Sequence, residues 1–275
     1  MTRVGLVGCG TIGTVLAQTI ERDYSRRATI VALHDHLPAQ ASALQHRLAS
    51  HPSILSLPQL VRRSDLVIEA AAASAASRVA QLALQAHRHV LIMSSGGLLA
   101  DLGWQRIARR SRGRLYVPSG GVSGLDGVKA LATGALRRVS LTTRKPPAGL
   151  MSAPFVQRRR MDLRRLRRPR LLFEGSPREA VRAFPQNTNV AATLALACLL
   201  QAPARSRRPA IRVRVVADPS LRCNVHEVEV DGEVGRVSCR IESRPSSTNP
   251  KTSEVAIRSA QVVLRQMFGS VQVGT

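Results

Sequence analysis

Residues 3–13, RVGLVGCGTIG, decide the fold, because a short apolar run containing β-branched valines leads directly into a GxGxxG pattern. A helix-like stretch, TVLAQTIERD, follows at 14–23. Between a strand and a helix, the first glycine permits a tight turn, the second lets the backbone approach a pyrophosphate, and the third allows close packing. N–H groups at the helix start would face the phosphates. The pattern predicts a dinucleotide site, whose expected contacts are Gly8, Gly10, Thr11, Ile12 and Gly13.

A second apolar run, ATIVALHD at 28–35, ends in Asp35, which lies 22 residues after Gly13. This is close to the spacing of a carboxylate that hydrogen-bonds the adenosine ribose. Such a carboxylate favours NAD, because it would repel the 2′-phosphate of NADP. The predicted cofactor is therefore NAD or NADP, since four nearby residues could accommodate that phosphate: Arg26, Arg27, His34 and His36.

Cys9 lies inside the glycine turn, near a helix N-terminus, where the pKa of a thiol can fall. A small filler residue is the simpler interpretation. The other cysteines, Cys198, Cys223 and Cys239, are far apart, and neither a CxxC pair nor a Cys/His ligand spacing is present. The sequence predicts no metal site.

Strand and helix patterns continue to alternate through the first part of the chain, which is typical of a doubly wound parallel (Rossmann) sheet that binds ligands at the carboxyl ends of its strands. We therefore expect the segments Ala71–Ser74 and Ser94–Gly97 to border the cofactor, although Ser94–Gly97 could equally be a plain turn. The predicted elements are a strand at 64–72, a helix at 77–87, a strand and loop at 89–98 and a helix at 104–112.

From about Tyr116 the pattern changes to one that favours a mainly antiparallel sheet with covering helices, so the fold class is α/β with a second α/β domain. The predicted domains are 1–116 and 117–248, and the helix within 249–275 is expected to return to the first domain. The predicted elements are a glycine-rich segment running into a helix at 117–131, strands at 137–147 and 211–219, a helix at 188–200 and a hairpin at 228–241 around Asp231-Gly232.

The charge is strongly basic: 41 Lys and Arg against 17 Asp and Glu give a formal net charge of +24. Such a charge raises the question of nucleic acid or an anionic membrane as partner. The densest stretch, residues 157–170, has no interleaved aromatic residues, and only 3% of the chain is aromatic. We expect a solvated surface helix or loop there, whose field could help gather acidic substrates, and do not expect nucleic acid as a partner.

No apolar run approaches the roughly 18 residues that a membrane-spanning helix needs. The first residues also lack the features of a signal peptide. The sequence therefore predicts a cytoplasmic protein without a membrane segment.

Several motifs together resemble the L-aspartate dehydrogenases of the homoserine-dehydrogenase-like group, over nearly the whole chain. They are GCGTIG, LYVPSGGVSGLDGVKA, TRKPP, LLFEGSPREAV, FPQNTNVAATLALA, ADP, NVHEVEVDG and PSSTNPKTSEVA. The resemblance implies oxidation of L-aspartate to iminosuccinate with NAD(P), feeding NAD synthesis, or reversible interconversion with oxaloacetate and ammonia. It also implies a homodimer.

The resemblance implies a role for particular residues. The catalytic histidine of the family falls on His226, within the segment that begins at Asn224, and imidazole suits proton transfer near neutral pH. A cofactor-contacting asparagine falls on Asn189. A further cofactor contact, an alanine in the family, falls on Gly121, which keeps the backbone available but loosens the loop.

Lysine is rare in this arginine-rich chain, and Lys129, Lys145 and Lys251 each fall inside a motif. A compact ammonium at these places would suit the substrate carboxylates. We expect Lys145 or Lys251 near the substrate, with Asn224 as a further candidate. The segment around Lys251 has a structural alternative, because Thr252 or Ser253 could cap the helix that follows.

Two other functions stay open on the sequence. A homologue could act on a different amino acid, imine or keto acid, which the glycine at 121 would permit. A basic Rossmann protein could instead bind nucleic acid or sense redox state without turnover, which would give steeply salt-dependent binding.

Overall fold

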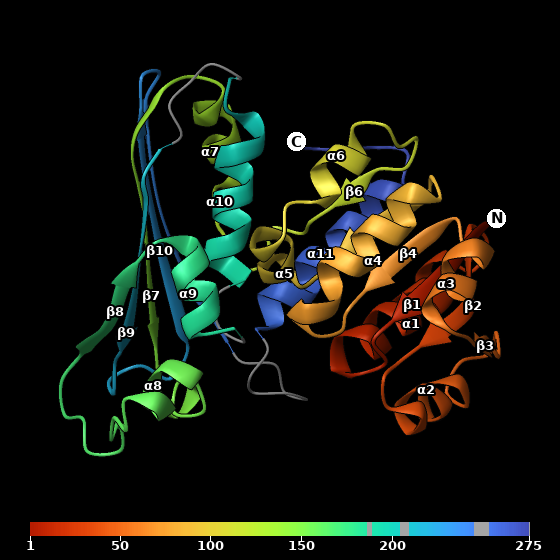
Figure 1. Cartoon of the computed structure of the whole chain (residues 1–275), viewed down its shortest axis with the longest axis horizontal. Coiled ribbons are helices and arrows are strands. Elements are labelled where there is room, and N and C mark those ends of the chain that lie inside the picture. The colour runs from red at the N-terminus through yellow and green to blue at the C-terminus, as the bar shows by residue number, and fades with distance from the viewer. Residues whose placement is uncertain (186–188, 204–208, 245–252, 275) are drawn as a thin grey trace. The chain divides into compact units, whose positions relative to one another are not determined.

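The computed structural model of the protein describes residues 1–185, 189–203, 209–244 and 253–274. The chain forms two compact units, which Figure 1 shows in colour along the sequence. The first unit contains Met1–Pro118 together with Ile257–Gln272, and the second begins at Ser119 and runs to Ala256.

The first unit holds a six-stranded parallel sheet in the order β3-β2-β1-β4-β5-β6. Its strands are β1 (Thr2–Val7), β2 (Ala28–His34), β3 (Ser53–Ile54), β4 (Leu66–Glu69), β5 (His89–Ile92) and β6 (Leu115–Tyr116). Its helices are α1 (Thr11–Tyr24), α2 (Pro38–Gln45), α3 (Leu57–Arg63), α4 (Ala73–Gln85), α5 (Ser95–Ala100), α6 (Trp104–Ala108) and most of α11 (Glu254–Phe268).

The residues of β1 point alternately to two layers of helices, one on each face of the sheet. Val4 and Leu6 lie in one apolar core with side chains of α1, α2 and α11. Gly5, between them, faces the opposite layer, where a Cβ would lie 2.5 Å from a side-chain carbon of Leu60 in α3. Because successive strand residues point to opposite faces, the sheet is covered on both sides. The doubly wound arrangement predicted from the sequence is confirmed.

The C-terminal helix α11 belongs to this first unit, as predicted. The rings of Tyr24 and Phe268 lie 5.2 Å apart, and the Arg27 guanidinium donates to the carbonyl of Phe268. Gln261 also donates to the hydroxyl of Thr19 in α1, at 2.9 Å. Apolar contacts and two hydrogen bonds therefore hold helix α11 against helix α1 and the residues that follow it.

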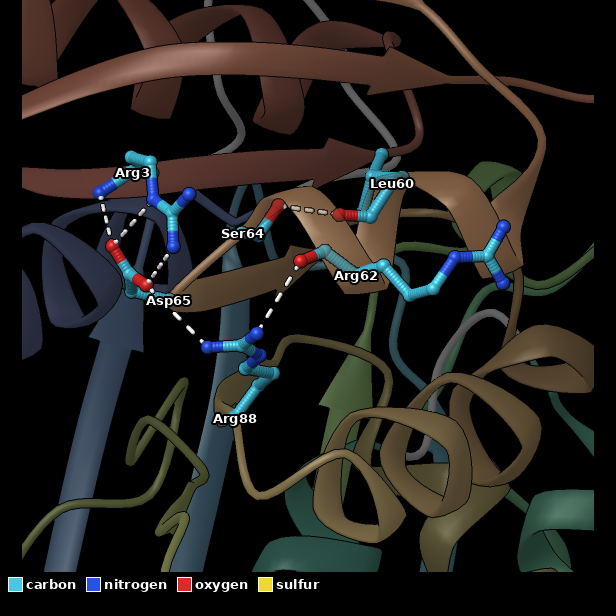
Figure 2. A network of polar contacts seen from close by, with 6 residues as sticks. All are labelled: Arg3, Leu60, Arg62, Ser64, Asp65 and Arg88. Atoms are coloured by element: carbon cyan, nitrogen blue, oxygen red, sulfur yellow. Dashed lines mark hydrogen bonds and ion pairs between the residues drawn. The ribbon is translucent and has the colours of Figure 1, made fainter.

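Charged residues connect the amino ends of three strands (Figure 2). The glycine turn lies at the other, carboxyl end of β1. Asp65, just before β4, accepts hydrogen bonds from the Arg3 backbone N at 3.0 Å and from the Arg3 guanidinium at 2.8 and 3.1 Å. Arg88, just before β5, forms an ion pair with Asp65 at 3.5 Å and donates to the carbonyl of Arg62 at 3.3 Å. These hydrogen bonds lower the pKa of Asp65 to about 2.

The second unit holds a five-stranded mixed sheet in the order β11-β10-β7-β9-β8, in which only β7 and β9 pair in parallel. Its strands are β7 (Leu136–Lys145), β8 (Arg170–Gly175), β9 (Ile211–Ala217), β10 (Asn224–Gly232) and β11 (Arg236–Ser243). Its helices are α7 (Leu125–Ala132), the 3-10 turn η1 (Pro147–Gly149), α8 (Pro154–Arg158), α9 (Pro177–Ala183) and α10 (Asn189–Gln201).

The two faces of this sheet differ in chemistry. Helices α7, α9 and α10 cover one face (Figure 1), and side chains of α7 and α10 share a core with Val139 and Leu141 of β7. The alternate residues of β7 point the other way, and some of them form ion pairs, such as Arg138 with Glu229 at 2.6 Å. Because side chains alternate along β7, Thr143 and Lys145 point to the face that the helices cover, and both are buried.

The structure corrects two local predictions. The hairpin of β10 and β11 exists, but Asp231 still pairs with Arg236, so the turn lies at Gly232–Gly235. The segment Ser94–Gly97 is largely the buried first turn of α5. In the part of the chain that the structure describes, no helix has the length and apolar character to cross a membrane.

Candidate active site

The glycine turn after β1 has the geometry that a dinucleotide needs. Gly8 has φ +93°, and a Cβ there would lie 2.6 Å from the backbone of Ala70 and Ala71. A Cβ at Gly13 would lie 1.9 Å from the carbonyl oxygen of Gly8. At Gly10, by contrast, the nearest protein atom would be 3.8 Å from a Cβ. The first and third glycines are required by the protein itself, and the second leaves space for a ligand to approach the backbone.

Helix α1 begins at Thr11, and its N-cap, Gly10, offers no capping side chain. The first N–H groups of a helix have no partner within the helix, so those of Thr11 and Ile12 are suited to donate hydrogen bonds to a pyrophosphate. The residues present fit the phosphate part of NAD(P).

Asp35 lies beside this turn, as its spacing predicted. Its Oδ2 accepts from the N–H of Cys9 at 2.7 Å, and its Oδ1 accepts from the N–H of Leu37 at 2.9 Å. His36 Nδ1 lies 3.1 Å from the same Oδ1. The carboxylate is therefore held next to the turn by two backbone groups, in a position suited to bind a ribose.

The thiol of Cys9 is not activated. Burial, followed by the negative charge of Asp35, raises the pKa of Cys9 to about 12. A lowered pKa is thus wrong for this residue, and the filler interpretation is correct.

The two segments expected to border the cofactor contact each other. The hydroxyl of Ser94 donates to the carbonyl of Ala71 at 2.9 Å. Glu69, at the end of β4, hydrogen-bonds both segments, yet sequence reasoning did not select it. The available signal was a lone carboxylate at the end of an apolar strand.

In the second unit, strand pairing brings His226 to Thr143 and near Lys145. His226 pairs in register with Thr143 across β10 and β7, and its Nδ1 lies 3.1 Å from the hydroxyl of Thr143. All three side chains are buried, with His226 3% and Lys145 6% exposed. Thr143 was not predicted, although its period-two spacing from Lys145 placed both on one face.

Burial controls the protonation of this cluster. Desolvation lowers the pKa of Lys145 to about 8. Desolvation, followed by the charge of Lys145, lowers the pKa of His226 to about 3. At neutral pH the cluster therefore holds a neutral imidazole near a buried ammonium.

Gly121 lies against the imidazole. A Cβ at this position would be 3.1 Å from Cδ2 and 3.3 Å from Nε2 of His226, and 3.2 Å from a methyl group of Val190. The missing side chain leaves the Nε2 edge of the ring uncrowded from this side. Asn189 is exposed and is the first residue of α10, directly before Val190.

The remaining predicted substrate residues have different outcomes. Asn224 is buried at the start of β10, two residues before His226. Lys129 forms an ion pair with Asp126 at 2.8 Å, which gives it a structural partner. Lys251 lies outside the described residues, as does Thr252. Ser253 precedes α11 and its hydroxyl hydrogen-bonds that of Ser243.

The arginines of the stretch 157–170 are exposed, as predicted, whereas Leu163 within it is buried. It includes the end of α8, a loop and the first residue of β8. Arg159 stacks 4.4 Å over the ring of Phe155, and Arg165 lies 3.9 Å from Asp162. Among the described residues, no group of three or more His, Cys, Asp or Glu side chains is arranged to hold a metal ion.

Comparisons with known proteins agree with this geometry. Residues 8–118 match the family model described as homoserine dehydrogenase, NAD binding domain, and residues 126–267 match the one described as aspartate dehydrogenase, C-terminal. The first unit is thus an NAD-binding domain.

Relatives and solved structures extend this match over the whole chain. The chain is 41% identical to the L-aspartate dehydrogenase of Methanosarcina acetivorans and 39% identical to that of Methanosarcina barkeri, over 100% of both chains in each case. Its fold resembles the crystal structure of aspartate dehydrogenase from Thermotoga maritima, with a TM-score of 0.74, 23% identity and full coverage of both chains. The chain belongs to the L-aspartate dehydrogenase family.

Proposed function

We propose that the protein oxidises L-aspartate to iminosuccinate with NAD(P)⁺, and that His226 is the acid–base group. The observation that carries this proposal is the buried cluster of Thr143, Lys145 and His226, in a chain that aligns with L-aspartate dehydrogenases over its full length. Bound NAD(P)⁺ would take the hydride from Cα of the substrate. The protein must then bind the carboxylates and accept a proton from the substrate nitrogen.

His226 is suited to accept that proton because its imidazole is neutral. In the tautomer that donates from Nδ1 to the Thr143 hydroxyl, Nε2 carries the free lone pair. This is the edge of the ring that Gly121 leaves uncrowded. Thr143 thus orients the ring, and Nε2 accepts the proton as the C=N bond of iminosuccinate forms.

Lys145 is suited to bind a substrate carboxylate. Desolvation is the larger cause of the lowered pKa of His226 and the charge of Lys145 is the smaller one, so an anion bound to Lys145 would offset the second cause. Substrate binding would then raise the basicity of His226 at the time when the proton must be accepted. Asn224 could supply a further hydrogen bond, because it lies on the same strand as His226.

Asp35 supports a preference for NAD over NADP. Its carboxylate is fixed beside the glycine turn and would repel a 2′-phosphate. The neighbouring His36 is exposed, and its contact with Asp35 turns it toward that carboxylate. We further propose that the enzyme is a homodimer, as the family resemblance implies, which light scattering of the purified protein would test.

The decisive experiment is coenzyme reduction by L-aspartate, run with NAD⁺ and with NADP⁺, and its reverse with oxaloacetate and ammonia. We expect turnover with L-aspartate, and a loss of about 10²-fold or more in His226→Gln. Arg240→Gln, on the opposite face of the same sheet, is a control that should retain activity. Reduction with another amino acid but not with aspartate would support the alternative substrate class. Full activity of His226→Gln would remove His226 from the mechanism.

A further inference from the structure

Glu69 is a fully buried carboxylate at the carboxyl end of β4. It pairs in register with Val7 of β1 on one side and with Ile92 of β5 on the other. The order of the sheet reverses between β1 and β4, and dinucleotides bind across such a reversal. Among apolar neighbours, a buried carboxylate at this place requires an explanation.

The carboxylate joins two segments of chain. Its Oε1 accepts from the N–H of Ala71 at 2.8 Å, and its Oε2 accepts from the N–H of Ser94 at 3.0 Å. The hydroxyl of Ser94 also donates to the carbonyl of Ala71, so that hydrogen bonds link Glu69, Ala71 and Ser94 in a closed set. Burial raises the pKa of Glu69, and the hydrogen bonds from Ser94 and Ala71 oppose that effect. The connections after β4 and β5 are thus fixed to one side chain.

Close packing limits the directions in which these two connections can move. The backbone of Ala70 and Ala71 lies against Gly8, where even a methyl group would overlap it. On the other side, a Cβ at Gly97 would lie 1.9 Å from the carbonyl oxygen of Ala73. Because packed backbone leaves little space on these sides, a connection released from Glu69 can shift only away from Gly8 and Ala73, which leaves the glycine turn in place.

The order of the strands assigns the two carboxylates to different halves of the coenzyme. Asp35 follows β2, and the glycine turn follows β1. With the pyrophosphate on the turn and the adenosine at Asp35, the nicotinamide half must extend over β4 and β5. Those are the strands whose connections Glu69 holds.

We propose that Glu69 is a positioning residue that fixes the 70–72 and 93–94 connections for the nicotinamide half of the coenzyme. The proposal rests on the coenzyme binding of the proposed function, and deepens it. It predicts that loss of Glu69 weakens binding of the whole coenzyme while leaving recognition of the adenosine half intact.

The test is Glu69→Gln, which keeps the shape but places an NH₂ group against one of the two backbone N–H groups. We expect the Kd for NADH, or for NADPH if that is preferred, to rise about tenfold or more, as the loss of one buried charge-assisted hydrogen bond allows. The Kd for ADP-ribose, or for its 2′-phosphate, should change by less than about twofold. Calorimetric titration measures all of these without any turnover.

Asp65→Asn is the matched control. Asp65 lies just before the amino end of β4, whereas Glu69 lies at its carboxyl end. The partners of Asp65, Arg3 and Arg88, also lie at the amino ends of their strands (Figure 2). This variant should lose thermal stability and keep both affinities. Ser94→Ala removes the hydroxyl contacts of Ser94 with Ala71 and Glu69 but keeps its backbone hydrogen bond to Glu69, and should weaken NADH binding about twofold to threefold. If Glu69→Gln does not fold, Ser94→Ala decides the question.

Unchanged NADH binding in Glu69→Gln, or equal losses for NADH and ADP-ribose, would overturn the proposal. So would unchanged NADH binding in Ser94→Ala where Glu69→Gln does not fold. A wild-type protein that binds NADH but does not oxidise aspartate would contradict the proposed substrate alone, because the binding comparison needs no substrate.

Discussion

Replacing Lys145 by methionine should stabilise the protein while abolishing its activity. The ammonium of Lys145 is buried, and desolvation lowers its pKa from 10.5 to about 8. Methionine has a similar length and no charge, so it removes the desolvation penalty and keeps the buried volume. The binding role proposed for Lys145 therefore opposes stability at this position.

The magnitude follows from the pKa. Each pKa unit corresponds to about 1.4 kcal/mol, so the fall to about 8 corresponds to a penalty of about 3 kcal/mol. Below pH 8 both the folded and the unfolded chain carry the charge, and the folded chain bears the full penalty. Between pH 8 and 10.5 the folded chain loses its proton first, so the penalty declines, and above 10.5 it is absent.

The assay is thermal unfolding of wild type and Lys145→Met at pH 7 and at pH 10.5, together with aspartate oxidation. At about 2–4 °C for each kcal/mol, the variant should melt roughly 6–12 °C higher at pH 7. The difference should shrink toward pH 10.5, apart from any constant gain from apolar packing. Lys129→Met is a control without this gain, because it removes an ion pair with Asp126.

Two results would refute the reasoning. A Lys145→Met protein that is less stable than wild type at pH 7 would mean that the ammonium is stabilised by its surroundings more than desolvation destabilises it. A stability difference that stays the same at both pH values would mean that protonation of Lys145 does not cause it.

Three further predictions concern other parts of the chain. The Arg3 hydrogen bonds lower the pKa of Asp65, so the wild-type protein should lose stability as the pH falls from 4 through 2. After allowance for solvent screening, the loss should be about 1 kcal/mol. Acid denaturation of Asp65→Asn should show no such loss. Asp35→Ser should raise the NADP/NAD ratio of kcat/KM about tenfold, and an unchanged ratio would show that this carboxylate does not select the coenzyme. Gly121→Ala should lower kcat about tenfold by crowding His226, and wild-type kcat would show that the ring can yield.

The cofactor half was readable from the sequence because its information is local. The tight turn at Gly8, the close packing at Gly13 and the position of Asp35 all depend on short spacings within one strand–helix–strand unit. What the sequence did not reveal there is burial: it left two interpretations of Cys9, a thiol of lowered pKa or a small filler residue, and only its desolvation distinguishes them. Helix α5 was missed for a related reason, since glycines at its start resemble a loop.

The substrate half was less readable because it depends on pairing between distant segments. Alternation along β7 placed Thr143 and Lys145 on one face, but the register that sets Thr143 beside His226 joins residues 83 apart in the chain. The parallel pairing of β7 with β9 inside an otherwise antiparallel sheet has no local signal either. The family resemblance identified His226, and the structure supplied its hydroxyl partner.

The high pKa of Cys9 also affects how fast the thiol in the glycine turn reacts with oxidants. With a pKa of about 12, only about one thiol in 10⁵ is ionised at neutral pH, and thiolates rather than thiols react with peroxides and alkylating agents. A cysteine in the middle of a phosphate-binding turn would otherwise be a point of oxidative inactivation. Here burial and the charge of Asp35 keep the Cys9 thiol protonated, so it should react with peroxides and alkylating agents more slowly than an exposed cysteine.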